Sequence, residues 1–275
     1  GWTHPIATAD KVAYLNALLK VRFPILDCGS FVSPKAIPQM ADTTAVLEQI
    51  DSAGNPDAGE NNTKLLVIVA NNRGIDAAIA VAKVHYLGFP LSLSETFQQR
   101  NTGKSIAEAM ETVQYLQEQC AAANKEAVVY LSMGFGNPYG DDYSPAIAAH
   151  FTAQLVALGI RTIALADTVG LALPPAIQAL FEELIPRYPE VTFSAHLHST
   201  KEAAAAKMDA AWAGGCRRFE GAIGGIGGCP MANDELVGNL ATEQIVAWAA
   251  GRGIDTGIDT TAFQNAQQQA RRIFM

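Results

Sequence analysis

The sequence predicts an α/β fold of the (β/α)8 TIM-barrel class, and three observations lead to this prediction. Short apolar, β-branched stretches alternate with helical patterns along the whole chain, as expected for repeated βαβ units with a parallel sheet covered on both faces. The length of 275 residues suits one barrel domain of about 250 residues. No G-x-G-x-x-G motif opens a helix after a first strand, which disfavours the alternative, a doubly wound open sheet.

The individual elements follow from the spacing of apolar residues and from breaks in the chain. Val12, Leu15 and Leu19 recur on one helical face, and Thr8 is a suitable N-cap for that helix. Proline and glycine clusters mark the turns between elements. We predict helices over 10–20, 43–51, 75–85, 105–123, 145–158, 174–187, 201–213, 241–250 and 261–273, and strands over 25–28, 65–70, 90–94, 127–133, 162–166, 193–199 and 218–223.

The strand count bears on how the barrel closes. A closed barrel needs eight strands, whereas the sequence predicts seven and begins with a helix. We therefore expect the first strand to lie just before Gly1. Residues 1–275 are expected to form a single catalytic domain.

Composition and charge restrict the class of partner. Hydrophobic residues make up 49% of the chain and the net charge is −8, which favours a folded enzyme for small molecules over a nucleic-acid binder. No basic leader and no long apolar segment is present, so we expect neither export nor membrane insertion. Four cysteines without C-x-x-C spacing are expected to be reduced, which indicates a cytoplasmic location.

The stretch Phe193–Ser199, FSAHLHS, carries two histidines two positions apart. Side chains alternate along a strand, so His196 and His198 are predicted to share one face. Two neutral imidazoles aimed into one cavity can hold a divalent metal ion. The alternative is a pair of satisfied polar side chains at the end of a strand.

Polar residues gather where the predicted strands end. In a (β/α)8 barrel the loops after the carboxyl ends of the strands build the active site. Each of these residues could alone be an ordinary loop residue or a helix cap, but their shared placement favours a site. They are Asp27, Ser30, Asn71, Asn72, Glu95, Asn101, Asn137, Asp167, His196 and His198.

A glycine-rich loop follows the last predicted strand. Gly221, Gly224, Gly225, Gly227 and Gly228 precede Cys229, and such a loop can bring its backbone close to a ligand. We predict that the Cys229 thiol acts as an acid or nucleophile; the alternative is a small packing residue.

Two polar residues after this loop are further candidates. Asn239 offers a carbonyl oxygen to a hard cation, or could serve as the N-cap of the next helix. Glu243 lies one helical turn further. It could face the cavity of the predicted metal site, or it could be an acidic residue that the helix dipole favours in a first turn.

In order and combination, six segments resemble the 3-hydroxy-3-methylglutaryl-CoA (HMG-CoA) lyases of the DRE-TIM metallolyase superfamily. The resemblance covers essentially the whole chain. The segments are SFVSPKAIPQMAD (30–42), LSETFQQRN (93–101), ADTVG (166–170), HLH (196–198), and GGIGGCP with GNLATE (224–243).

The resemblance implies roles for individual residues. It implies that His196, His198 and the Asn239 carbonyl bind a divalent metal, Mg²⁺ or Mn²⁺, with Zn²⁺ also compatible. It implies catalytic roles for Cys229, Asp167, Glu243 and Asp27, the last standing where the family usually carries Glu. We assign Ser30, Asn101, Gly227 and Gly228 to substrate binding.

The resemblance also implies a reaction, the retro-Claisen cleavage of HMG-CoA to acetyl-CoA and acetoacetate. We expect an acyl-CoA substrate and a homodimer. The alternatives are a related metal-dependent aldolase or Claisen-condensing enzyme, or a non-catalytic metal-binding scaffold.

Three departures from the family pattern accompany the resemblance. The Arg-Asp motif of the family's first strand is expected a few residues before Gly1. The run PMANDELVG is one residue longer than the family form and carries more charge. Asn137 replaces a cysteine that is common in its loop. The altered run affects the identity of the acyl-CoA more than the reaction class.

Overall fold

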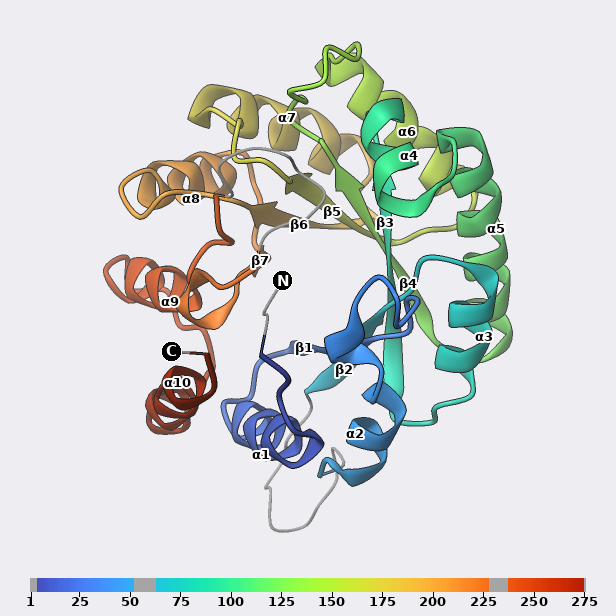
Figure 1. Cartoon of the computed structure of the whole chain (residues 1–275). Helices are drawn as coiled ribbons and strands as arrows, with labels where there is room; N and C mark the ends of the chain where they lie inside the picture. Colours follow the sequence, from blue (N-terminus) through green and yellow to red (C-terminus); the bar gives the residue numbers. More distant parts are fainter. Residues whose placement is uncertain (1–3, 52–62, 228–236, 275) are drawn as a thin grey trace. The chain divides into compact units, whose positions relative to one another are not determined.

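The computed structural model describes residues 4–51, 63–227 and 237–274 and confirms the (β/α)8 barrel class. These residues contain a seven-stranded parallel sheet in which the strands are ordered as in the sequence, β1 to β7. Helices alternate with the strands along the chain (Figure 1). The strands are β1 (Ile25–Ser30), β2 (Lys64–Ile68), β3 (Val84–Ser92), β4 (Glu126–Ser132), β5 (Thr162–Asp167), β6 (Thr192–Leu197) and β7 (Phe219–Glu220).

The helices largely follow the predicted periodicity. They are α1 (Thr8–Leu19), α2 (Thr43–Gln49), α3 (Asn72–Ile79), α4 (Glu95–Thr102), α5 (Ile106–Ala122), α6 (Pro145–Ala157), α7 (Pro174–Arg187), α8 (Ala204–Ala213), α9 (Thr242–Ala250) and α10 (Thr260–Phe274). No helix among the described residues is long and apolar enough to span a membrane.

The chain divides into two compact units. Unit 1 comprises Gly1–Gly88, Gln119–Glu126 and Asp255–Met275, and unit 2 comprises Phe89–Glu118 and Ala127–Ile254. Unit 1 contains β1, β2 and helices α1, α2, α3 and α10, whereas unit 2 contains β4 to β7 with the helices between them. The prediction of a single domain over 1–275 stays a prediction.

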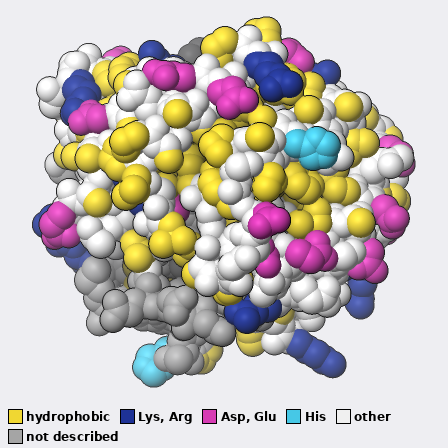
Figure 2. Space-filling model, turned by 90° about the horizontal axis from the view of Figure 1, so that it is seen from above, with side chains coloured by type: hydrophobic (Ala, Val, Ile, Leu, Met, Phe, Trp, Pro, Cys, Tyr) yellow, Lys and Arg dark blue, Asp and Glu magenta, His cyan; other side chains and the backbone are white. Residues whose placement is uncertain are grey.

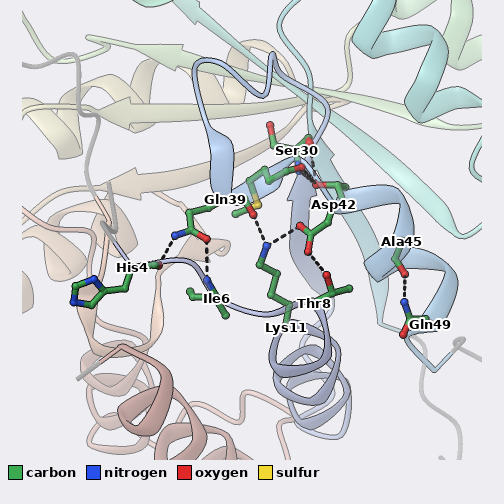
Figure 3. A network of polar contacts seen from close by, with 11 residues as sticks. His4, Ile6, Thr8, Lys11, Ser30, Gln39, Asp42, Ala45 and Gln49 are labelled. Atoms are coloured by element: carbon green, nitrogen blue, oxygen red, sulfur yellow. Dashed lines mark hydrogen bonds and ion pairs between the residues drawn. The ribbon is translucent and has the colours of Figure 1, made fainter.

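In unit 1, polar contacts join the segment before α1 to the loop between β1 and α2 (Figure 3). The Gln39 side chain bonds the His4 carbonyl oxygen (2.5 Å) and the Ile6 amide (3.2 Å). Lys11 Nζ donates to the Gln39 carbonyl oxygen (2.5 Å) and to Asp42 Oδ1 (2.6 Å), and Thr8 Oγ1 donates to Asp42 Oδ2 (2.6 Å). The sequence prediction that Thr8 is the N-cap of α1 is therefore wrong. Ala7 holds that position, and the Thr8 hydroxyl donates a hydrogen bond to Asp42 instead.

Several elements differ from the sequence prediction, and of the predicted strand 218–223 only Phe219–Glu220 forms β7. Residues 84 and 85 were assigned to a helix, but α3 ends at Ile79 and β3 begins at Val84. Val84, Leu87 and Leu91 are almost fully buried, which indicates that β3 is covered on both faces. Gly88 and Pro90 therefore lie inside β3, whereas the sequence analysis began the strand at residue 90. Helix α4 was missed because its sequence, ETFQQRNT, is polar and lacks an apolar stripe.

Three of the four cysteines belong to the described residues, and all three are buried free thiols. They are Cys28, Cys120 and Cys216. Burial raises the pKa of each thiol, to about 12 for Cys120 and about 11 for Cys216, and raises the pKa of Cys28 further. Such thiols carry almost no reactive thiolate near neutral pH.

The surface carries charges of both signs. On the face shown in Figure 2, acidic and basic side chains are interspersed among hydrophobic ones. That face carries no basic patch of the kind that binds nucleic acid.

Candidate active site

The predicted histidine pair lies at the end of β6 in unit 2. His196 is in the strand and His198 follows directly after it. The centres of the two imidazole rings lie 5.7 Å apart, with their planes tilted by 46°. The two-residue spacing therefore places both rings on the same side of the strand, as predicted.

Glu220 at the end of β7 orients the His196 ring. His196 Nδ1 lies 3.0 Å from Glu220 Oε2, and the Ser194 hydroxyl donates to Glu220 Oε1 at 2.6 Å. Burial opposes the charged carboxylate, but the hydrogen bonds from His196 and Ser194 and the charge of Arg218 outweigh burial and keep the Glu220 pKa below its ordinary value. The ionised carboxylate fixes the proton on Nδ1, which leaves Nε2 as the ring's lone-pair donor.

The His198 ring is fixed by a backbone carbonyl in the same way. His198 Nδ1 lies 2.8 Å from the Val237 carbonyl oxygen, which can only accept, so Nδ1 donates. Burial, together with the neighbouring His196, lowers the pKa of His198 to about 4. His198 is therefore neutral near neutral pH, with its Nε2 lone pair without a hydrogen-bond partner among the described residues.

Asn239 lies beside His198 because the chain after the glycine loop pairs with the end of β6. His198 and Asn239 form an antiparallel bridge, and the Leu240 amide donates to the Leu197 carbonyl oxygen at 3.0 Å. Asn239 Nδ2 donates to the Ile226 carbonyl oxygen at 3.1 Å, so Oδ1 is the atom left for a ligand. The N-cap alternative is wrong, because α9 begins at Thr242 with Ala241 as its N-cap.

Gly227 approaches Asn239 closely. It has φ +107°, and a Cβ atom at this position would lie 2.8 Å from Asn239 Nδ2. Glycine is thus required here both for the backbone conformation and for the contact with Asn239. The described part of the glycine loop therefore lies against the Asn239 side chain.

These donors fit a divalent cation. Each imidazole has its Nδ1 held by an acceptor, the arrangement found for metal-binding histidines, whose second nitrogen faces the ion. Two Nε2 atoms and one amide oxygen form a mixed N and O donor set. The described residues contain no group of three or more His, Cys, Asp or Glu side chains that could hold a metal.

Asp167 ends β5 next to the histidine strand, with its backbone paired to Leu197. Its side chain is only 2% exposed and forms an ion pair with Lys207 of α8 at 2.7 Å, while Oδ1 accepts from the Ala172 amide at 3.0 Å. Burial raises the pKa of Asp167, and Lys207 opposes that rise. The carboxylate is therefore held in place by its neighbours, whereas its catalytic role stays a prediction.

Glu243 in the first turn of α9 holds the glycine loop. Both of its carboxylate oxygens lie within 3.0 Å of the Gly224 amide nitrogen. Gly224 has φ +72°, a backbone conformation that this contact stabilises. Glu243 therefore contacts the glycine loop, and its predicted place in the metal cavity and its catalytic role both stay predictions.

The remaining predicted residues lie in different surroundings. In unit 1, the buried Ser30 bonds its hydroxyl to the Ile68 carbonyl oxygen at 3.3 Å, and Asp27 is exposed on β1. In unit 2, Asn101 is half-buried in α4. Cys229 and Gly228 lie outside the described residues.

Sequence reasoning missed Glu220 and Lys207. Glu220 lies in the middle of the last predicted strand, 218–223, and becomes a strand end only because β7 stops at Glu220 in the structure, so the rule used for the other rim residues did not reach it. Lys207 follows Ala204 by three residues and precedes Met208 and Ala211, so a lysine on the buried face of an alanine-rich helix was the available signal.

Comparison with known proteins agrees with the geometry. A family model described as HMGL-like matches residues 2–269. The chain is 33% identical over 257 residues to the (R)-citramalyl-CoA lyase of Chloroflexus aurantiacus, covering 92% of this chain and 80% of that protein. It is 32% identical over 253 residues to the hydroxymethylglutaryl-CoA lyase YngG of Bacillus subtilis, covering 92% and 82%.

A solved structure shares the fold over nearly the whole chain. The HMG-CoA lyase of Acinetobacter baumannii, in complex with coenzyme A and 3-methylmalate, matches with a TM-score of 0.89 and 28% identity, covering 98% of this chain and 86% of that one. The barrel, the histidine pair and the match along nearly the whole chain lead to one conclusion. The chain belongs to the HMGL-like family of carbon–carbon lyases.

Proposed function

We propose that this protein is a divalent-metal-dependent lyase that cleaves HMG-CoA to acetyl-CoA and acetoacetate. The observation that carries the proposal is the pair of imidazoles, each with Nδ1 held by an acceptor and Nε2 left for a ligand. The family membership and the relatives named as lyases of acyl-CoA compounds support the substrate class.

His196, His198 and the Asn239 amide oxygen would hold the cation. When bound, a divalent cation stabilises negative charge on the oxygen atoms of the substrate. Mg²⁺ and Mn²⁺ suit this mixture of nitrogen and oxygen donors, and Zn²⁺ is compatible with it.

The chain's own residues would move two protons. The C3 hydroxyl of the substrate gives its proton to a carboxylate, for which Asp167 at the end of β5 is the candidate. The C2–C3 bond then breaks, and its electron pair passes to the thioester as an enolate while C3 becomes the ketone of acetoacetate. Cys229 gives its proton to C2 of the enolate and so forms acetyl-CoA.

Other residues would position the substrate and the loop. Glu243 would hold the glycine loop at Gly224, a contact present in the structure. Ser30, Asn101, Gly227 and Gly228 stay predicted substrate-binding residues, and Asp27 a predicted catalytic residue. The homodimer also remains a prediction.

A second substrate is favoured by one of the relatives, the citramalyl-CoA lyase. Citramalyl-CoA and HMG-CoA both carry a tertiary alcohol β to the thioester, and they differ by one methylene in the acid portion. Cleavage would yield pyruvate from the first and acetoacetate from the second, with acetyl-CoA in both cases. Assaying both substrates and identifying the keto acid distinguishes the two functions.

Substitution of His196 tests the proposal. His196→Ala should abolish metal retention and thioester cleavage, whereas His150→Ala, an exposed histidine on α6, should change neither. Bound metal is measured by elemental analysis after dialysis, and cleavage by release of acetyl-CoA with and without EDTA. A His196→Ala protein that keeps full metal-dependent activity would overturn the ligand assignment, and a parent protein that cleaves neither substrate would overturn the reaction.

A further inference from the structure

Lys207 joins the two strand ends that carry the candidate site. It lies in the first turn of α8, and its side chain is only 6% exposed. Its ammonium lies within hydrogen-bond distance of three oxygens: Asp167 Oδ2 at 2.7 Å, the His198 carbonyl oxygen at 2.8 Å and the Gly170 carbonyl oxygen at 3.1 Å. An ammonium has three N–H donors, so Lys207 has an acceptor for every one of them.

The Gly170 contact leads to the same histidine by a second route. Gly170 has φ +76° and lies against the Val237 side chain, where an added Cβ would approach Val237 Cβ to 3.1 Å. The Val237 carbonyl oxygen in turn accepts the hydrogen bond from His198 Nδ1. Lys207 therefore holds the His198 backbone directly, and also holds the loop that packs against the acceptor of the His198 ring.

We propose that Lys207 is a positioning residue, which sets the orientation of the His198 imidazole and of the Asp167 carboxylate. This inference rests on the proposed function for the roles of His198 and Asp167. A residue that only stabilised the fold would need no contact with either group, whereas the three bonds of Lys207 end on the last residue of β5, on the loop after β5 and on the residue after β6. Loss of a residue that orients metal ligands typically weakens metal binding about 10- to 100-fold.

Lys125 provides a matched control. Its ammonium also donates to two backbone carbonyl oxygens, those of Val81 at 2.7 Å and Val84 at 2.5 Å. All three residues belong to unit 1, and none is a candidate ligand. Lys207→Met and Lys125→Met thus each remove a carbonyl-binding ammonium, but only the first removes one that bonds to His198.

The first measurement is the affinity for Mn²⁺ by titration calorimetry on the folded, full-length protein. Lys207→Met should bind Mn²⁺ at least about 10-fold more weakly than the parent. The Mn²⁺ affinity of Lys125→Met should stay within about twofold of the parental affinity, even if its melting temperature falls as much as that of Lys207→Met.

The second measurement needs neither metal nor substrate. The chain has five histidines, so ring-¹⁵N-labelled histidine gives a spectrum in which each ring can be assigned by substitution. Lys207→Met should shift or broaden the His198 ring signals, and Lys125→Met should leave them unchanged.

A second background covers the case in which Lys207→Met does not fold, since it leaves a buried carboxylate without its partner. Asp167→Asn removes that charge. The double variant Asp167→Asn with Lys207→Met should bind Mn²⁺ more weakly than Asp167→Asn alone, because the bond to the His198 carbonyl is lost only in the double variant.

The outcomes separate this proposal from the proposed function. Folded Lys207 variants with unchanged Mn²⁺ affinity and unchanged His198 signals would overturn the positioning role. A parent that binds Mn²⁺ but cleaves no thioester would overturn the reaction and leave the positioning role supported by the affinity difference. If the parent binds no Mn²⁺, the ring spectra decide: changed His198 signals in Lys207→Met support the role, and unchanged signals refute it.

Discussion

At the scale of single residues, the candidate site depends on the hydrogen-bond acceptors that orient its two imidazole rings. His196 and His198 each have Nδ1 held by an acceptor, one from a side chain of β7 and the other from the backbone after the glycine loop. The H-x-H spacing alone predicted that the rings share a face, because strand periodicity fixes it. The acceptors could not be predicted in that way, since they come from segments far along the chain.

The Glu220 carboxylate provides the sharpest test of this arrangement. Glu220→Gln removes the charge that fixes the His196 tautomer, and should weaken Mn²⁺ binding about 10- to 100-fold, measured by calorimetry. Glu182→Gln on α7 is the control, because Glu182 contacts Gln178 on the exposed helix surface. Equal affinities for the parent and both variants would mean that Glu220 does not support a ligand.

Cys229 carries the predicted proton transfer to the enolate. Cys229→Ser should slow turnover by about 10² or more, the usual contribution of a positioned proton donor. The rate is measured as acetyl-CoA release at saturating substrate and metal, with Cys120→Ser, a buried thiol of α5, for comparison. A Cys229→Ser enzyme with the parental rate would assign the thiol to loop packing.

At the scale of elements, the start of α4 depends on a carboxylate from another loop. Asp141 accepts from the Ser94 hydroxyl at 2.5 Å and from the Thr96 amide at 2.9 Å. These hydrogen bonds, with that of Ser94 the strongest, lower the Asp141 pKa below its ordinary 3.8. Since the folded pKa is the lower one, the stabilisation is present above pH 3.8 and disappears as the pH falls through the folded value.

Asp141→Asn tests this stabilisation. The variant should lose about 0.5–1 kcal/mol of unfolding free energy near neutral pH, and the difference from the parent should shrink as the pH falls below 3.8. Urea denaturation at several pH values measures it. The neighbouring, exposed Asp142 gives the control Asp142→Asn, which should show neither effect; a pH-independent difference for Asp141→Asn would contradict the role of its charge.

The same scale shows where sequence patterns succeed and fail. Helix α7 matches the prediction at both ends, because proline marks its start and apolar residues recur on one face. Helix α4 was missed because its start is stabilised by Asp141, which lies 45 residues after Thr96, and its polar sequence carries no periodic signal. The limits of β3 failed for a related reason: burial on both faces outweighed the local effect of glycine and proline.

At the scale of the whole molecule, length and element order were sufficient to predict the barrel class. The division of the chain into two compact units was not predicted, because it depends on contacts between segments that are distant in sequence. The boundary falls within β3, after Gly88, so one strand belongs to both units.

The shared strand predicts that unfolding is a single cooperative transition. Trp212 and Trp248, whose ring centres lie 5.7 Å apart, report on unit 2, while the far-ultraviolet circular dichroism reports on the helices of both units. In a Trp2→Phe background, urea curves from fluorescence and dichroism should coincide. Curves with separate midpoints would show that the units unfold as independent domains and would refute the single-domain prediction.

The buried thiols also make the protein convenient for chemical labelling. Cys28, Cys120 and Cys216 are shielded and remain protonated at mildly alkaline pH, so a maleimide or iodoacetamide reagent should spare them in the native protein. With four cysteines in the chain, a single adduct in the intact mass would identify Cys229 without any substitution. A fluorophore attached there would then provide a probe at the single residue to which the proton transfer to the enolate is assigned.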